Sequence, residues 1–129
     1  MHAVDVVRAW QEAVNSGDLK RLLELSEDQI EMIGPHGRGR GADLLDGWLE
    51  RSGFSGEIRQ IFARGSAVVV MERGTWRNPG SGAISGAGVA LAFAIAGARV
   101  ARFARFDDLG AALNHAGLSE ADLVWQLEP

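Results

Sequence analysis

The sequence predicts one α+β domain in which helices pack on one face of a curved antiparallel sheet. Apolar residues recur at helical spacing before residue 50, and from residue 57 onward they alternate with a period of two. Helices and strands that are segregated in this way form an α+β layer rather than repeated βαβ units. The 129 residues, of which 47% are hydrophobic, can bury one core, and no linker or repeat divides them. We therefore expect a single domain over residues 1–129.

Three helices are expected ahead of the main part of the sheet. They cover about residues 2–15, 19–26 and 44–49, where apolar residues return every three to four positions. Asp18 precedes the second helix, and its carboxylate can accept hydrogen bonds from the free backbone N–H groups there. Asp43 precedes the third helix, where the helix dipole favours a negative charge.

Strands are expected on both sides of the third helix. A short strand over residues 29–33 precedes it, and residues 34–41 are expected to form a loop, because four glycines and a proline sustain neither period. The strands after the third helix alternate with a period of two and are joined by short turns that contain glycine. They cover residues 57–64, 67–77, 89–96 and 99–106.

The strand over residues 89–96 is apolar on both faces. Its large side chains point one way, and they are Val89, Leu91, Phe93 and Ile95. Its alanines point the other way. One of these faces must lie away from the helices, and an exposed apolar sheet face of that size typically marks an interface. We therefore expect a homodimer, because a two-fold pair is the commonest symmetric assembly.

A short helix over residues 109–116 is expected near the end of the chain. Either of the two aspartates before it can cap its start, and Gly117 can end it. Ser119 and Asp122 have the spacing that caps one last turn.

The residue types that are missing exclude several kinds of site. Without cysteine the chain has no disulfide, thiolate nucleophile or cysteine-ligated metal, and without tyrosine it has no phenol. The three histidines are too dispersed to suggest a metal site, so we expect neither metal nor cofactor. A net charge of -4 gives no general attraction to nucleic acid. The start lacks the pattern of a signal peptide and no stretch is long enough to span a bilayer, so we expect a cytoplasmic protein that contacts neither nucleic acid nor membrane.

Several segments resemble one known superfamily. Residues 7–11 (VRAWQ) and 15–19 (NSGDL) resemble the first two helices of the nuclear transport factor 2-like superfamily, which includes the ketosteroid isomerases, the SnoaL-like polyketide cyclases and the limonene epoxide hydrolases. Residues 33–45, 97–103 and 106–118 resemble the passage from its first strand to its third helix, its closing hairpin and the ending of many bacterial SnoaL-like proteins. The resemblance implies a cone-shaped α+β barrel, or cystatin-like roll, with an apolar cavity.

The catalytic residues of these enzymes do not carry over to this chain. The isomerases use a carboxylate base together with a tyrosine and a protonated aspartic acid. By resemblance these positions fall on Gly34, on Gln11 or Trp10, and near Leu91. The acid of the cyclases falls near Arg105, and the Asp-Arg-Asp set of the hydrolases lacks its acids on the later strands. Ketosteroid isomerisation is therefore excluded by residue type.

Two titratable residues are candidates for catalysis. Glu72 shares strand parity with Val70 and Trp76, so it lines the cavity if that face points inward, and Arg102 is then its candidate partner. A desolvated carboxyl has a raised pKa and could act as an acid or a base. The alternative is an ordinary cross-strand pair at the rim of the sheet, or an exposed side chain. His36 lies in the loop at the expected pocket mouth, where it is either a general base or simply exposed.

Two further groups are candidates for binding. Arg38 and Arg40 lie between glycines before a helix and could hold an anion, although Gly-Arg repeats are also typical of a flexible loop. Aromatic and other large side chains could line the cavity or simply fill the core. The candidates for ligand contact are Trp10, Met32, Trp48, Phe54, Trp76, Phe93, Arg102 and Phe103.

The leading functional hypothesis is a cavity that binds a small hydrophobic or amphipathic molecule, such as one that carries a carboxylate. The alternative is an isomerase, cyclase or hydrolase that uses Glu72 or His36 as an atypical acid or base. A second alternative is a protein-interaction or dimerisation module, because a sheet of this kind often forms a partner surface.

Overall fold

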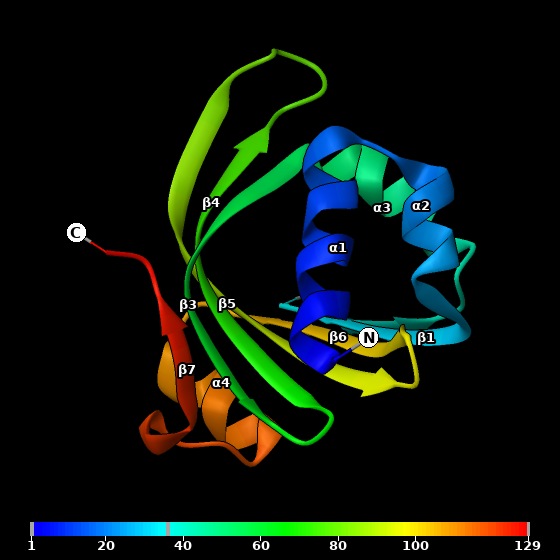
Figure 1. Cartoon of the computed structure of the whole chain (residues 1–129). Helices are drawn as coiled ribbons and strands as arrows, with labels where there is room; N and C mark the ends of the chain where they lie inside the picture. Colours follow the sequence, from blue (N-terminus) through cyan, green and yellow to red (C-terminus); the bar gives the residue numbers. More distant parts are fainter. Residues whose placement is uncertain (1, 36, 129) are drawn as a thin grey trace.

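The computed structural model describes residues 2–35 and 37–128, which form four α-helices and one curved sheet of seven strands (Figure 1). The helices are α1 (Ala3–Ser16), α2 (Leu19–Glu24), α3 (Leu44–Ser52) and α4 (Leu109–Ala116), and a 3-10 turn, η1, covers Glu120–Asp122. The strands are β1 (Ser26–Gly34), β2 (Gly37–Arg40), β3 (Phe54–Arg64), β4 (Ala67–Arg77), β5 (Ile84–Ala96), β6 (Arg99–Phe106) and β7 (Leu123–Gln126). The α+β architecture expected from the sequence is confirmed.

The strands lie in the order β2-β1-β6-β5-β4-β3-β7, and all neighbours are antiparallel except β1 and β6. The expected tight turns join β3 to β4 at Gly65 and β5 to β6 at Gly97. Both glycines have a φ of 61°, a left-handed conformation that glycine adopts without strain. Among the helices described, none has the length and apolar character needed to cross a bilayer.

The concave face of the sheet holds the main core. α1 turns Val6, Val7 and Trp10 toward the sheet, and all three are fully buried. They belong to one apolar cluster with Leu91 and Phe93 of β5. The large side chains of β5 therefore point toward the helices, and the burial of this apolar surface provides the main driving force for the packing of α1 on the sheet.

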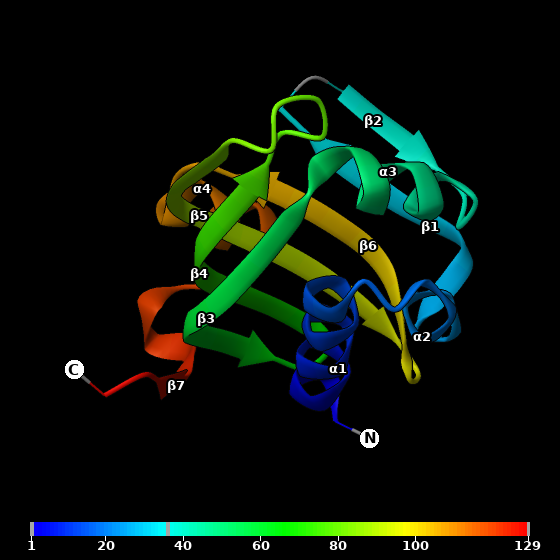
Figure 2. The same ribbon diagram turned by 90° about the horizontal axis from the view of Figure 1, so that it is seen from above.

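The convex face is covered by α4, which lies on the opposite side of the sheet from α1, α2 and α3 (Figures 1 and 2). Ala90 and Ala92 of β5 are buried there in a second cluster with Ala112 and Leu113 of α4. Small alanine side chains allow the helix to approach the sheet closely. Much of this apolar face is thus covered by α4 of the same chain. The expected homodimer rested on this face being exposed, and that premise is wrong. The homodimer itself stays a prediction.

Two short strands differ from the sequence prediction. β2 lies within the segment expected to be a loop, and it pairs with β1 in a hairpin whose last pair is Gly34 and Gly37. α3 comes close to β2 here, and a Cβ added at Gly39 would lie 2.7 Å from Leu44 Cδ1, so the Leu44 side chain would have to shift. β7 pairs with β3 and is too short to show a period in the sequence. Both strands depend on pairing with a neighbour rather than on their own residue pattern.

The expected helix caps are present. Asp18 Oδ1 accepts a hydrogen bond of 3.1 Å from the Arg21 backbone N–H, and Asp108 Oδ2 accepts one of 3.1 Å at the start of α4. Ser119 and Asp122 form the capping box of η1. These caps involve residues only three positions apart, so the sequence alone reveals them.

A buried chain of hydrogen bonds joins α1, α2 and β1. Trp10 Nε1 donates to Ser26 Oγ over 3.0 Å, and Ser26 Oγ donates to the Leu22 carbonyl over 2.7 Å. Trp10 is fully buried and Ser26 is 2% exposed. A buried indole N–H without an acceptor is costly, so Ser26 allows the large Trp10 ring to occupy the core.

Replacing Ser26 with alanine should lower the free energy of unfolding by about 1–3 kcal/mol, because the Trp10 N–H then has no acceptor. Chemical denaturation followed by tryptophan fluorescence measures the loss. Ser16→Ala is the matched control, since the Ser16 hydroxyl bonds the Glu12 carbonyl at the exposed end of α1 and should contribute less than about 0.5 kcal/mol. Equal losses in the two variants would contradict this role of Ser26.

Candidate functional site

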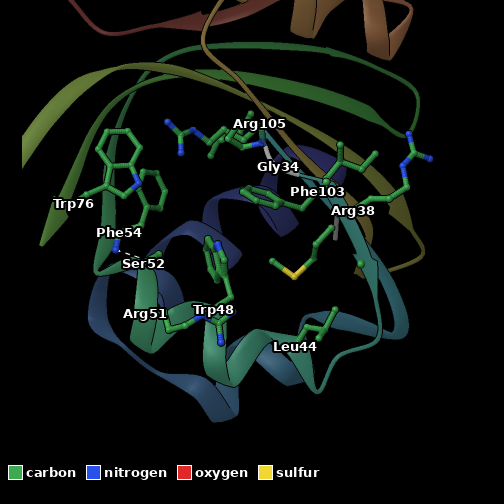
Figure 3. A pocket seen from close by; sticks show the side chains of 16 residues that line it. Gly34, Arg38, Leu44, Trp48, Arg51, Ser52, Phe54, Trp76, Phe103 and Arg105 are labelled. Atoms are coloured by element: carbon green, nitrogen blue, oxygen red, sulfur yellow. Dashed lines mark hydrogen bonds between the residues drawn. The ribbon is translucent and has the colours of Figure 1, made fainter. Parts of the chain in front are cut away.

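A cavity of about 750 Å³ lies between α3, the β1–β2 hairpin and the facing parts of β4, β5 and β6 (Figure 3). Most of its wall is apolar. The large apolar side chains on the wall are Met32, Leu44, Trp48, Phe54, Trp76, Leu91 and Phe103. A concave apolar space with a few polar groups at its edge is typical of a small-molecule site.

Aromatic rings form much of the cavity wall. Phe103 stacks on Trp10 with 5.0 Å between ring centroids, and Trp48 meets Phe103 edge-on at 5.6 Å. Phe54 and Trp76 form a second pair, 5.2 Å apart (Figure 3). Trp10 itself is fully buried behind the wall, so the rings that face the cavity are held in place by close packing.

Three arginines reach the cavity from different elements: Arg38 from β2, Arg51 from α3 and Arg105 from β6 (Figure 3). Arg38 has 71% of its side chain exposed, whereas Arg105 has 33%. Among the described residues that line the cavity, none is acidic. The rim of the cavity is therefore positively charged.

The Arg105 guanidinium is positioned by an aromatic ring. Its Cζ lies 4.7 Å from the centroid of the Trp76 ring, a cation–π contact. One Nη lies 3.5 Å from Asp107 Oδ1, while Nε is buried and has no hydrogen-bond partner in the described part of the chain. The guanidinium therefore has a fixed place and donors that the protein leaves free.

Five of the eight ligand-contact candidates line the cavity, and they are Met32, Trp48, Phe54, Trp76 and Phe103. Trp10 and Phe93 do not, because they lie in the core behind it. Arg51 and Arg105 were not among the candidates. Arg105 could have been found from its strand parity, because it stands two residues after Phe103 on the same face of β6.

The positions at which the resemblance places catalytic acids lie on the cavity wall. Gly34, Leu91 and Arg105 stand there in this chain. Near the position at which the resemblance places the acid of the cyclases, this chain has the positively charged Arg105. In the described ranges, no three histidine or acidic side chains come together in a group that could hold a metal ion.

Arg102 lies on the convex face, and the expected pair with Glu72 is wrong. Its Nε donates to Glu31 Oε1 over 2.7 Å, and this hydrogen bond is the main reason why the pKa of Glu31 lies below its ordinary value. A register shift in the pairing of β5 with β6 breaks the strand parity that the expectation assumed. Arg38 and Arg40 also flank Glu31, at 3.7 and 3.5 Å, so part of their charge is already balanced.

Glu72 points to the helix side of the sheet together with Val70, whose parity it shares, but it does not line the cavity. It is 1% exposed, and burial raises its pKa to about 8. β3 packs so closely on it that a Cβ added at Gly56 would clash with its carboxyl group. The carboxyl is therefore mostly protonated at neutral pH. His36, the other catalytic candidate, lies outside the described residues.

The directions of the surrounding hydrogen bonds also place a proton on Glu72. Asn15 Nδ2 donates to the Gly56 carbonyl over 2.9 Å, and Asn15 Oδ1 accepts from the Gly56 N–H over 2.8 Å. Gln11 Nε2 donates to the same Asn15 oxygen over 2.9 Å, so Gln11 Oε1 faces the Glu72 oxygens at 2.6 and 3.0 Å. Two oxygens at this distance must be joined by a hydrogen bond, and the protonated Glu72 carboxyl donates it to Gln11 Oε1. The reverse Gln11 orientation would set its oxygen against Asn15 Oδ1.

Replacing Glu72 with glutamine should make the protein increasingly more stable than the wild type as the pH rises. The unfolded carboxyl loses its proton near pH 4.5 and the folded one only near 8, so between these values ionisation favours the unfolded state. Between pH 4.5 and pH 8 the free energy of unfolding of the wild type should fall by up to about 5 kcal/mol relative to that of the variant. Above pH 8 the difference should stay constant. Urea denaturation at several pH values measures the difference.

Glu57→Gln is the matched control for this experiment. Glu57 lies on the neighbouring strand β3, and 61% of its side chain is exposed. Its difference from the wild type should change little over the same pH range. A difference for Glu72→Gln that does not grow with pH would contradict a buried, neutral carboxyl.

The comparison with known proteins identifies relatives of this chain by fold and not by sequence. Neither models of known protein families nor curated protein sequences match the chain. Among solved structures, an NTF2-like protein from Burkholderia xenovorans LB400 has a TM-score of 0.69 at 25% identity, over 88% of this chain and 95% of its own. An LEH-like epoxide hydrolase from M. tuberculosis has a TM-score of 0.73 at 21% identity, over 88% of each chain. TerC, co-crystallised with polyporic acid, has a TM-score of 0.69 at 14% identity, over 88% of this chain and 96% of its own.

These matches each extend over 88% of the chain. Their identities are low, so they bear on the fold and leave the chemistry of the cavity to this chain's own side chains. The fold that the sequence resemblance implied is confirmed. This chain has the fold of the nuclear transport factor 2-like superfamily.

Proposed function

We propose that this protein binds a small, largely aromatic molecule in the cavity between α3 and the sheet. The observation that carries the proposal is the wall itself, which encloses about 750 Å³ with aromatic and aliphatic side chains. Cavities of roughly 300–1,000 Å³ with such walls hold drug-sized ligands. The exposed faces and edges of the wall rings offer favourable contacts to a flat aromatic ligand.

Binding is favoured over the enzymatic alternative by the side chains that the described wall offers. A general acid or base must lie within about 3 Å of the atom that it serves or reach it through one water. Glu72 is buried away from the wall, and the arginines on the wall do not release their protons in proteins. An isomerase, cyclase or hydrolase reaction would therefore depend on His36, which is not among the described residues.

The fold is compatible with both functions. It occurs in an epoxide hydrolase and in TerC, the protein co-crystallised with polyporic acid. A shared fold supports a similar place for a ligand, whereas the class of ligand depends on the side chains that surround that place. Here those side chains are mainly aromatic and aliphatic, which favours the binding proposal.

Replacing Met32 with tryptophan should block binding. Met32 is half-buried on the cavity wall, so the larger side chain takes up space that the ligand needs. The neutral dye N-phenyl-1-naphthylamine, whose emission increases in apolar surroundings, serves as the probe in a fluorescence titration. We expect the dye to bind the variant at least ~10-fold more weakly than the wild type, a difference of about 1.4 kcal/mol or more.

Met71→Trp is the matched control, because Met71 is also half-buried but packs against the cluster on the convex face. Overpacking should cost each variant about 1–3 kcal/mol of stability, which melting curves measure, but only Met32→Trp should lose the dye. Unchanged binding to Met32→Trp would contradict the proposed site. A wild-type protein that does not bind the dye would contradict the proposed function.

A further inference from the structure

We infer that the ligand carries an anionic group, a carboxylate or a similar oxyanion, which binds Arg105 while the aromatic part lies against Trp76 and Phe54. This inference rests on the proposed function and adds the chemical class of the ligand. The cavity can bind an aromatic molecule without the anionic group, so the two statements can fail separately.

Arg105 has free donors for such a group. Its Nε is buried and donates to no described atom. Among the described residues its only hydrogen-bond partner is Asp107, at the long distance of 3.5 Å, and the Asp107 side chain is 83% exposed. A guanidinium has five N–H donors, and its two Nη groups can together donate two hydrogen bonds to a carboxylate. The Arg105 side chain is 33% exposed and lines the cavity, so an oxyanion there can accept from its Nη groups.

The Trp76 ring places the guanidinium next to the aromatic part of the wall. The distance of 4.7 Å between Arg105 Cζ and the ring centroid is that of a cation–π contact. Trp76 in turn packs on Phe54, with 5.2 Å between centroids. Figure 3 shows these three side chains on neighbouring parts of the wall. A ring that rests on Trp76 and Phe54 would therefore bring an attached acid group close to Arg105.

The other charges at the rim also favour an anion. Arg51 forms no ion pair with any described residue, and Arg38 shares the single carboxylate of Glu31 with Arg40 and Arg102. The described lining has no acid to balance Arg51 and Arg105. In a half-enclosed apolar space such positive charge attracts anions and repels cations. An anionic ligand is the class that this rim stabilises.

Two dyes that differ by one acid group test the inference. 1-Anilinonaphthalene-8-sulfonate has the same ring system as N-phenyl-1-naphthylamine and an added sulfonate. Replacing Arg105 with glutamine should weaken binding of the sulfonate dye ~10-fold or more and leave binding of the neutral dye within about 2-fold of the wild type. Added salt should weaken binding of the sulfonate dye alone, because it screens the attraction between the charges.

Two further variants complete the test. Arg99→Gln is the matched control, because Arg99 is an exposed arginine of the same strand that does not line the cavity, and both dyes should bind it as they bind the wild type. Arg105→Lys keeps the positive charge but loses the planar fork, so it should retain part of the affinity for the sulfonate dye. Unchanged binding of the neutral dye shows that each variant is folded.

The outcomes distinguish this inference from the proposed function. Equal effects of Arg105→Gln on the two dyes, or no effect on either, overturn the inference, even where Met32→Trp still blocks the neutral dye. Loss of both dyes in both Arg105 variants assigns Arg105 a structural role and also overturns the inference. Failure of the wild type to bind the neutral dye overturns the proposed function itself.

Discussion

The Trp10 indole fills the inner end of the concave face, where its buried N–H needs a hydrogen-bond partner. The ring contacts Trp48 of α3 and Phe93 and Phe103 of the sheet, with centroids 5.9, 5.4 and 5.0 Å away. Ser26 accepts the N–H and so joins α1 to the start of β1. Because close packing around one large ring fills this end, the space that remains at the other end is a cavity with fixed walls.

Position within the fold decides whether a charged group on the concave side is neutralised or stays charged, as Glu72 and Arg105 illustrate. Glu72 lies where α1 covers β4, and desolvation keeps its carboxyl neutral at pH 7. Arg105 lies on the cavity wall, where its guanidinium contacts the Trp76 ring and stays partly exposed. The chain has a net charge of -4, yet the rim of its cavity is positive. The charge at the cavity rim thus has the opposite sign to the net charge of the chain.

Local features of this fold can be predicted from the sequence, whereas the site depends on longer-range contacts. The cap at Asp18, the turn at Gly65 and the two alternating apolar faces of β5 each depend on residues close together in the chain, and the structure confirms them. Arg102 is misplaced because a register shift between strands leaves no trace in the sequence. The sequence shows which residues of β4 share a face with Glu72. It does not show that α1 covers Glu72, nor that the cavity lies at another part of the sheet.

A crystal structure of the protein with 1-naphthoate, a flat aromatic carboxylate, tests most directly whether the cavity binds an aromatic anion at Arg105. We predict density for the naphthalene ring against Trp76 and Phe54, with the carboxylate oxygens within about 3 Å of the Arg105 Nη atoms. Density outside the cavity, or a carboxylate inside it that turns away from Arg105, would contradict this conclusion.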